Sequence, residues 1–296
     1  MPGCGIHLIL ASRVANSFRD RSERASFFAG AIAPDMGYFP GGDRFTSDLA
    51  HYVRAGELAR SLKRCANEGY AASFARGWAT HVLADILIHP LINRAASELA
   101  GNSPSNALTF ADNPVAHIRV EQGLDAVIAA RFRPSRFWRA RNQSFVAVAV
   151  RLLSQAYGET YHYASSIRHL TRSCQAVSLG VPLLLRYGRS ASQLFGACDG
   201  RKAEASRGAF ALARLATALF PRSPLNALSR PHPPSDWLLS EVSRAMDEFP
   251  ARFSAIEASG LADLPDCNLD TGELENVPYP LALAAREELA RRGGTI

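Results

Sequence analysis

Histidine and carboxylate side chains at four-residue intervals constrain this chain more than any other feature of its sequence. His81, Asp85 and His89 lie in a largely apolar run that extends from Gly77 to Pro90. Because a step of four residues rotates only about 40° around an α-helix, the three side chains share one face. The apolar surroundings predict that this face is buried, and a buried charge needs a partner. The run therefore predicts a core helix that carries metal ligands.

A second pair repeats this spacing on the next predicted helix. His117 and Glu121 lie shortly after Asn113 and Pro114, which suit the N-cap and the first position of a helix. Side chains four residues apart have Cβ atoms about 5–6 Å from each other, close enough to bind one ion. One such pair is usually a surface pair or a capped core histidine. Two pairs on antiparallel neighbouring helices predict a multinuclear metal site.

Further nitrogen and oxygen ligands come from the residues before these helices. His51 lies near the start of the preceding predicted helix, and Asp35 lies in the loop before it. Neutral imidazole together with carboxylate suits zinc, although the same donors bind iron or manganese. Zinc is the predicted metal. The other histidines of the second half lack a carboxylate at helical spacing and are expected to be surface or core residues, namely His162, His169 and His232.

Helical periodicity dominates the chain, and no series of alternating polar and apolar residues indicates a sheet. The predicted fold class is all-α, a multi-helix bundle with extra C-terminal helices. Pro and Gly rule out a regular helix in the loop 33–42, and Pro90 is expected to kink or end its helix. Residues 1–142 are predicted to form the metal-binding core, with residues 143–296 packed on it as one globular unit. The helices are expected at about residues 7–14, 46–66, 71–99, 114–131, 144–158, 161–186, 191–218, 235–258 and 279–292.

Composition narrows the partners only a little. The formal charge of +6 favours anionic partners such as phosphate esters, lipid headgroups or nucleic acid, but an Arg-rich and Ala-rich chain also reflects genomic composition. The five cysteines are scattered and never spaced as C-x-x-C, so neither a disulfide partner nor a Cys-based zinc site is predicted. No export signal is recognised at the N-terminus, and a cytoplasmic location is expected.

Five segments follow one another in a fixed order over roughly the first 130 residues. They are GIH at 5–7, GAIAPD at 30–35, DLAHY at 48–52, GWATHVLADILIHP at 77–90 and HIRVE at 117–121. Together they resemble the zinc-dependent phospholipase C family, whose fold is shared by the single-strand-specific nucleases of fungi and plants. The resemblance implies an all-helical fold and a three-zinc cluster that hydrolyses phosphodiesters.

The resemblance also implies a role for each candidate ligand. One zinc ion would be held by Asp35, His51, His81 and Asp85. A second would be held by His89, His117 and Glu121. His7 would bind a third ion, which Asp85 bridges to the first, and Asp35 would be the general base for the attacking water. In secreted members an N-terminal Trp completes the third site, whereas this chain begins with Met1-Pro2-Gly3, so two or three zinc ions are predicted.

The predicted function is a zinc-dependent phosphoric-ester hydrolase of the phospholipase C type, which uses a metal-activated water on a phosphodiester. The expected partner is a phospholipid headgroup or another small phosphoester, with contact to a membrane surface; Glu121 in place of Asp resembles the phospholipase branch. A single-strand nuclease is one alternative, with nucleic acid in a cationic groove formed by arginines between residues 131 and 141. The other is a non-catalytic protein in which the metals staple the helices, since residues 143–296 show no catalytic motif.

Two further segments contain residue types that are common in binding sites. Tyr38, Phe39 and Phe45 follow Asp35 and would either line a headgroup or base pocket or anchor the loop in the core. The segment Asn268–Gly272 has acidic and Gly residues like those of a calcium loop, but it is too short for one and is predicted to be a turn.

Overall fold

The computed structural model describes residues 3–15, 18, 20–67, 69–103, 107–138, 143–192 and 230–296. Over these residues all regular secondary structure is helical, and the elements are joined by turns and loops. An isolated antiparallel bridge pairs Cys267 with Leu274. The all-α prediction is confirmed. The helices are α1 Cys4–Val14, α2 Arg21–Gly30, α3 Arg44–Tyr52, α4 Ala55–Cys65, α5 Gly69–Leu99, α6 Pro114–Phe132, α7 Gln143–Tyr161, α8 Ile167–Ser192, α10 Asp236–Ala258 and α11 Pro280–Arg291. Two 3₁₀ segments are η2 Ala33–Tyr38 and η3 Pro134–Arg136.

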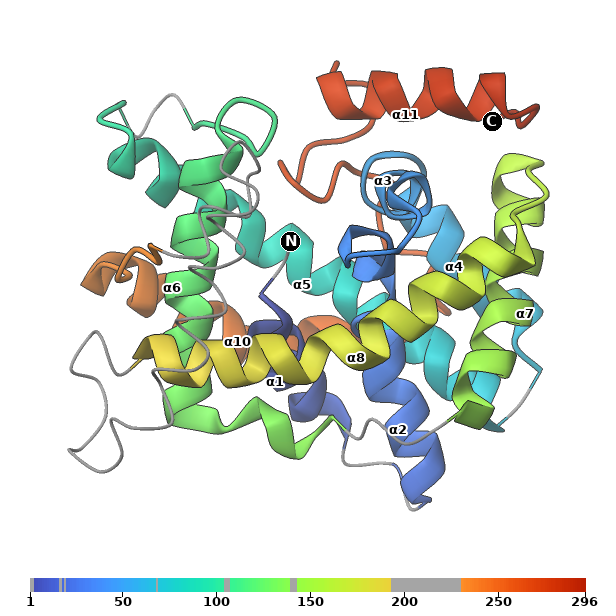
Figure 1. The fold of residues 1–296 in the computed structure, drawn as a ribbon, viewed down its shortest axis with the longest axis horizontal. Coiled ribbons are helices and arrows are strands. Elements are labelled where there is room, and N and C mark those ends of the chain that lie inside the picture. The colour runs from blue at the N-terminus through green and yellow to red at the C-terminus, as the bar shows by residue number, and fades with distance from the viewer. Residues whose placement is uncertain are drawn as a thin grey trace.

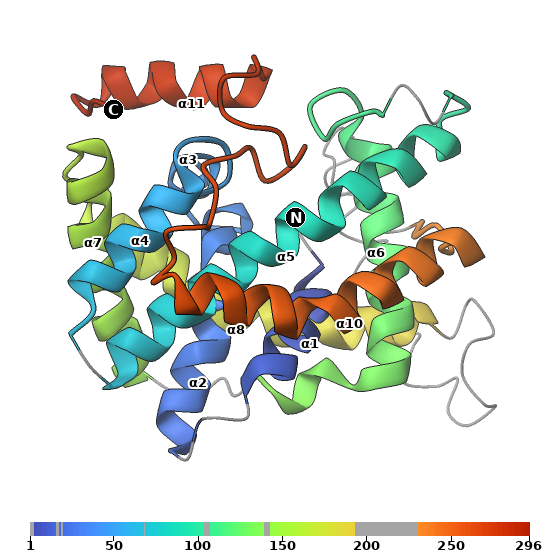
Figure 2. The ribbon, with the colours of Figure 1, turned by 180° about the vertical axis from the view of Figure 1, so that it is seen from behind.

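The long helix α5 is the centre of the bundle. It contacts α1, α2, α4, α6, α7 and α10, while α8 crosses one side of the molecule (Figure 1) and α10 crosses the opposite side (Figure 2). Trp78 is fully buried, and the helix is apolar over most of its surface, as expected for a helix enclosed by others. The helix continues through Pro90 to Leu99, so Pro90 does not end it.

Two glycines allow α2 to cross α5 at very short range. A Cβ atom at Gly77 would lie 1.9 Å from the carbonyl oxygen of Phe27, and one at Gly30 would lie 2.0 Å from that of Phe74. Only residues without a side chain can occupy these positions. The crossing brings the segment after α2, which begins η2, against the polar face of α5.

The structure corrects the predicted helices near the N-terminus. Helix α2 was not predicted, although Asp20 caps it by accepting a hydrogen bond from Ser22 N and Glu23 follows at the spacing of a capping box. The single helix expected over residues 46–66 is two helices, because Arg54 adopts a left-handed conformation with φ of 50°. The loop predicted over residues 33–42 contains the 3₁₀ segment η2 and no α-helix.

The C-terminal half packs around the first half. Helix α7 contacts α4 and α5, α8 contacts α6 and η2, α10 contacts α5, and α11 contacts α3. The helix expected from residue 161 begins at Ile167 instead, after His162 with its φ of 46°. The helix expected over residues 191–218, and most of the Pro-rich loop after it, lie outside the described residues. The division at residue 142 stays a prediction.

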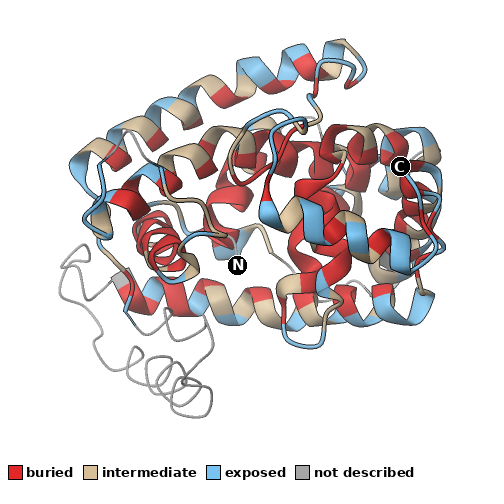
Figure 3. Cartoon of the chain, turned by 90° about the horizontal axis from the view of Figure 1, so that it is seen from above, coloured by how far each residue is buried: buried red, intermediate tan, exposed pale blue. Residues whose placement is uncertain are grey.

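Burial follows the same arrangement. Buried residues line the inner faces of the helices, and exposed residues face outward (Figure 3). Among the described residues, no helix combines the length and the apolar character needed to cross a membrane. Four cysteines of this part of the chain are free thiols, namely Cys4, Cys65, Cys174 and Cys267, and Cys198 lies outside it.

Candidate metal centre

The carboxylate of Asp85 lies among four imidazoles in the core. Its Oδ2 is 3.0 Å from His81 Nε2 and 3.5 Å from His51 Nε2, and its Oδ1 is 3.2 Å from His7 Nε2 and 3.5 Å from His89 Nε2. Asp85 and His81 are fully buried, and the other three histidines are nearly so. The carboxylate of Asp85 thus faces one imidazole from α1, one from α3 and two from its own helix, α5.

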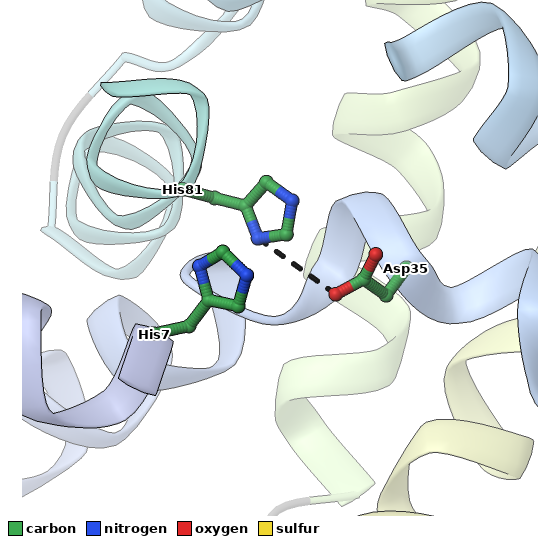
Figure 4. Close-up of side chains that lie close together, drawn as sticks. All are labelled: His7, Asp35 and His81. Carbon is green, nitrogen blue, oxygen red and sulfur yellow. Dashed lines mark ion pairs between the residues drawn. The ribbon is translucent and has the colours of Figure 1, made fainter. Parts of the chain in front are cut away.

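Segment η2 places the second carboxylate beside these imidazoles. Asp35 is fully buried, and its Oδ1 lies 3.1 Å from His51 Nε2. The hydroxyl of Ser47 donates to the carbonyl of Pro34 and accepts from the backbone N–H of Gly37, which fixes η2 against α3. In Figure 4 the side chains of His7, Asp35 and His81 converge from α1, η2 and α5, and Asp35 Oδ2 lies 3.9 Å from His81 Nδ1.

Helix α1 is held in place by a carboxylate of α6. The backbone N–H groups of Gly5 and Ile6 donate to Asp125, at 2.9 and 3.0 Å. Negative charge suits this position because the first N–H groups of a helix have no partner within the helix. Burial nevertheless raises the pKa of Asp125 to about 7. The contact sets the position of His7, whose ring stacks on that of His81 with centroids 4.0 Å apart.

A second set of ligands lies one turn further along α5. His89 Nε2 is 3.5 Å from Glu121 Oε1, and the rings of His89 and His117 meet edge to face at 5.4 Å. All three side chains are buried. We call His89, His117 and Glu121 the second metal group. The first metal group consists of His7, Asp35, His51, His81 and Asp85.

Hydrogen bonds on the far side of three imidazole rings fix their tautomers. Nδ1 of His51 lies 2.7 Å from Ser47 O, and Nδ1 of His81 lies 3.0 Å from Ala31 O. Carbonyl oxygens only accept, so each Nδ1 carries a proton and each Nε2 is the nitrogen left to bind a metal. His117 Nδ1 lies 2.8 Å from Asn93 Oδ1 in the same way. Metal-binding histidines are commonly oriented by such partners.

The residues present fit zinc. Both oxygens of Asp35 and of Asp85, together with Oε2 of Glu121, are buried without a hydrogen-bond partner. Ligand atoms lie within 4.8 Å of one another in three buried groups, which are His7, Asp35 and His81; His51, His81 and Asp85; and His89, His117 and Glu121. A cation within these groups would compensate carboxylate oxygens that have no hydrogen-bond partner.

The histidines and carboxylates of the two groups shift one another's pKa values. Burial alone would raise the pKa of Asp85, but His81, His89 and His7 outweigh it and hold that pKa well below its usual value. Burial alone would lower the pKa of His89, but Asp85 and Glu121 raise it to about 10. A proton and a metal ion would therefore compete for His89.

The three aromatic residues expected either to line a pocket or to anchor the loop, Tyr38, Phe39 and Phe45, lie in different surroundings. The ring of Tyr38 lies 5.3 Å from that of His51, and its hydroxyl donates to Asp48. Phe39 and Phe45 are buried core residues. Only Tyr38 of the three therefore lies beside the metal groups.

Sequence reasoning missed several supporting residues. Asn93 and Asp125 continue the two four-residue series by one further step, and this signal would have found them. Asp270 comes close to His117, with its Oδ1 3.8 Å from His117 Nδ1, although the segment 268–272 forms the predicted turn. No local pattern links that turn to the metal centre.

Fold and site together define a helical protein with a buried group of candidate metal ligands. The sequence profile of a family described as zinc-dependent phospholipase C matches residues 6–174, more than half of the chain. The protein belongs to this family. No curated protein and no solved structure matches the chain. The family match confirms the predicted resemblance and extends beyond the predicted boundary at residue 142 into α8.

Proposed function

We propose that this protein is a zinc-dependent phosphoric-ester hydrolase of the phospholipase C type. The position of the buried Asp85 carboxylate, among four imidazoles and with no hydrogen-bond partner among the described residues, carries the proposal. Asp35, His51, His81 and Asp85 would hold one zinc ion. His89, His117 and Glu121 would hold a second. His7, together with Asp85, would hold a third.

The chain's own side chains would prepare the site for hydrolysis. When bound, zinc would lower the pKa of a water molecule toward about 7 and stabilise negative charge on phosphate oxygens. Asp35 is the proposed general base, because its carboxylate remains ionised: burial raises its pKa, but His81 and His51 outweigh that effect and lower it. Asp35 would accept the proton that the attacking water releases. The backbone carbonyls behind His51 and His81 keep both rings aimed at this region.

A phospholipid headgroup or another small phosphoester, met at a membrane surface, is the proposed substrate. The family match supports this class. A nuclease on the same fold needs several stacking aromatics beside the metals, and Phe39 and Phe45 are committed to the core instead. Of the arginines expected to form a cationic groove, Arg139 and Arg141 lie outside the described residues. A cytoplasmic location stays a prediction.

Turnover of a generic phosphodiester, a short-chain phosphatidylcholine and single-stranded DNA tests the proposal. The wild type is compared with Asp85→Asn, which removes the central charge, and with Asp20→Asn, which keeps a capping oxygen at the exposed start of α2. We expect the first variant to lose zinc and turnover together and the control to keep both. Cleavage of DNA alone would favour the nuclease, and bound zinc without turnover on any substrate would favour a structural role for the metals.

A further inference from the structure

The segment between α10 and α11 returns to the metal centre from the far end of the chain. It passes beside α4 and α3 on its way to α11 (Figure 2). The backbone N–H of Leu269 donates to the carbonyl of His51 at 2.9 Å, and the carbonyl of Asp270 accepts from Asn93 Nδ2 at 2.6 Å. The segment therefore contacts His51 of the first metal group, and it contacts Asn93, the hydrogen-bond partner of His117 in the second metal group. It lies outside the residues that the family profile matches.

Asp270 is a buried carboxylate to which no Lys or Arg side chain of the described residues is bonded. Its Oδ2 accepts from the hydroxyl of Tyr279 at 2.5 Å and from the backbone N–H of Phe110 at 2.9 Å. Its Oδ1 has no hydrogen-bond partner and lies 3.8 Å from Nδ1 of His117. Burial of an ionised carboxylate is unfavourable unless a nearby charge compensates it. A cation bound at the second metal group is the compensation that this position offers.

Asn93 connects the same residue to the ligand through hydrogen bonds. Its Nδ2 can only donate, and it donates to the carbonyl of Asp270, so its Oδ1 faces His117 Nδ1. This orientation requires a proton on Nδ1 and leaves Nε2 of His117 as the metal-binding nitrogen. The backbone carbonyl of Asp270 thus fixes the orientation of the Asn93 side-chain amide, and this amide fixes the tautomer of His117.

We propose that Asp270, held by Tyr279, is a positioning residue for His117, and that the segment Cys267–Tyr279 completes the second metal group from outside the family's matched region. Its carbonyl orients Asn93, and its carboxylate adds negative charge beside the ring. The inference rests on the proposed function in one respect, namely that the second metal group binds zinc. It makes no use of the reaction itself.

Metal binding by matched variants tests this inference. Asp270→Asn keeps the size and the acceptor of the side chain but removes its charge, and Tyr279→Phe removes the hydroxyl that holds it. Asp266→Asn is the control: Asp266 lies directly before this segment, where it bonds Arg60 and the backbone of Glu57 rather than a metal group. Zinc affinity is measured by competition with a chromophoric chelator, and cobalt(II) absorption reports the ligand geometry.

We expect Asp270→Asn to weaken the binding of one zinc ion by about 10- to 100-fold and to change the cobalt(II) spectrum. Tyr279→Phe should act in the same direction with a smaller effect, and it carries the test if Asp270→Asn does not fold. The control should match the wild type. Affinities and spectra unchanged in both variants would overturn the inference, as would an equal loss in the control, because the segment would then act only through folding.

These measurements separate the inference from the proposed function. A wild type that binds zinc without turnover would contradict the hydrolase and leave the comparison of affinities intact. A wild type that binds zinc and hydrolyses phosphoesters, but loses no affinity on Asp270→Asn, would contradict only the inference.

Discussion

The two metal groups are built in different ways. The first metal group takes its five side chains from α1, η2, α3 and α5, and the carboxylate of Asp85 contacts the three imidazoles of the group. The second takes three side chains from only α5 and α6, and it is supported from outside by Asn93 and the segment after α10. The comparison indicates that the first group depends on how closely several elements approach one another, whereas the second depends on two helices and their outer hydrogen bonds.

The largest expected effect is the loss of zinc and of activity when one ligand of either metal group is replaced. Glu121→Gln should remove the zinc of the second group and leave the first filled, whereas His51→Gln should do the reverse. Phosphodiester hydrolysis should fall by more than about 100-fold in both variants, since loss of a ligand exceeds loss of an outer partner. Zinc content per chain, measured with activity, checks this result. Complete loss of zinc in both variants would mean that the groups form one cooperative cluster.

The next effect tests the close helix crossing beneath the first group. Gly77→Ala would place a Cβ atom 1.9 Å from the carbonyl oxygen of Phe27, and overpacking of this kind should lower the free energy of unfolding by about 3 kcal/mol. Zinc should be lost from the first group before the second. Gly158→Ala is the matched control, because nothing lies within 4 Å of the new atom. It should raise stability by about 0.5–1 kcal/mol. Urea unfolding measures the free energy of unfolding of both variants, and equal values would contradict the prediction.

Zinc affinity should depend on pH mainly at the second metal group. His89 must lose its proton to bind zinc, and its metal-free pKa is about 10, so zinc affinity should rise by about tenfold per pH unit between pH 7 and 9. Because this pKa lies above the value of about 6.5 in an unfolded chain, the stabilisation of the metal-free fold is complete below pH 6.5. It is lost as pH rises toward 10. Calorimetric titrations in buffers of different ionisation enthalpy count the released protons, and a pH-independent affinity would contradict the assignment.

The smallest effect concerns the start of α6. The side chain of Asn113 accepts a hydrogen bond from the backbone N–H of Ala116, one residue before His117. Asn113→Ala should therefore cost about 1 kcal/mol of stability, and Asn113→Asp should retain most of it. Zinc content should stay the same, because the outer partners of His117 are untouched. Thermal unfolding with elemental analysis measures both, and a loss of zinc would show that the cap itself positions the second group.

The part of the site that could be predicted from the sequence is the part that helical spacing encodes. His81, Asp85 and His89 share a face of α5, and His117 and Glu121 share one of α6, since local geometry alone decides this. Asn113 is the helix cap that the sequence predicted. These residues needed no knowledge of the rest of the chain.

The remainder depends on contacts between distant residues. The left-handed Arg54, which splits the helix expected over residues 46–66, donates from its backbone to Glu275 and from its side chain to Thr160. The break falls at Arg54 and not at the nearby Gly56, so its position does not follow from a local Gly or Pro. Asp270 reaches Asn93 across 177 positions of the sequence. Tertiary packing, and not local propensity, brings such pairs together.

The zinc content of the purified wild-type protein, produced with ample zinc and measured by elemental analysis, tests the central claim most directly. Buried carboxylates without hydrogen-bond partners, together with imidazoles whose Nε2 atoms face them, predict two or three tightly bound zinc ions per chain. Less than one zinc ion per chain would contradict the account.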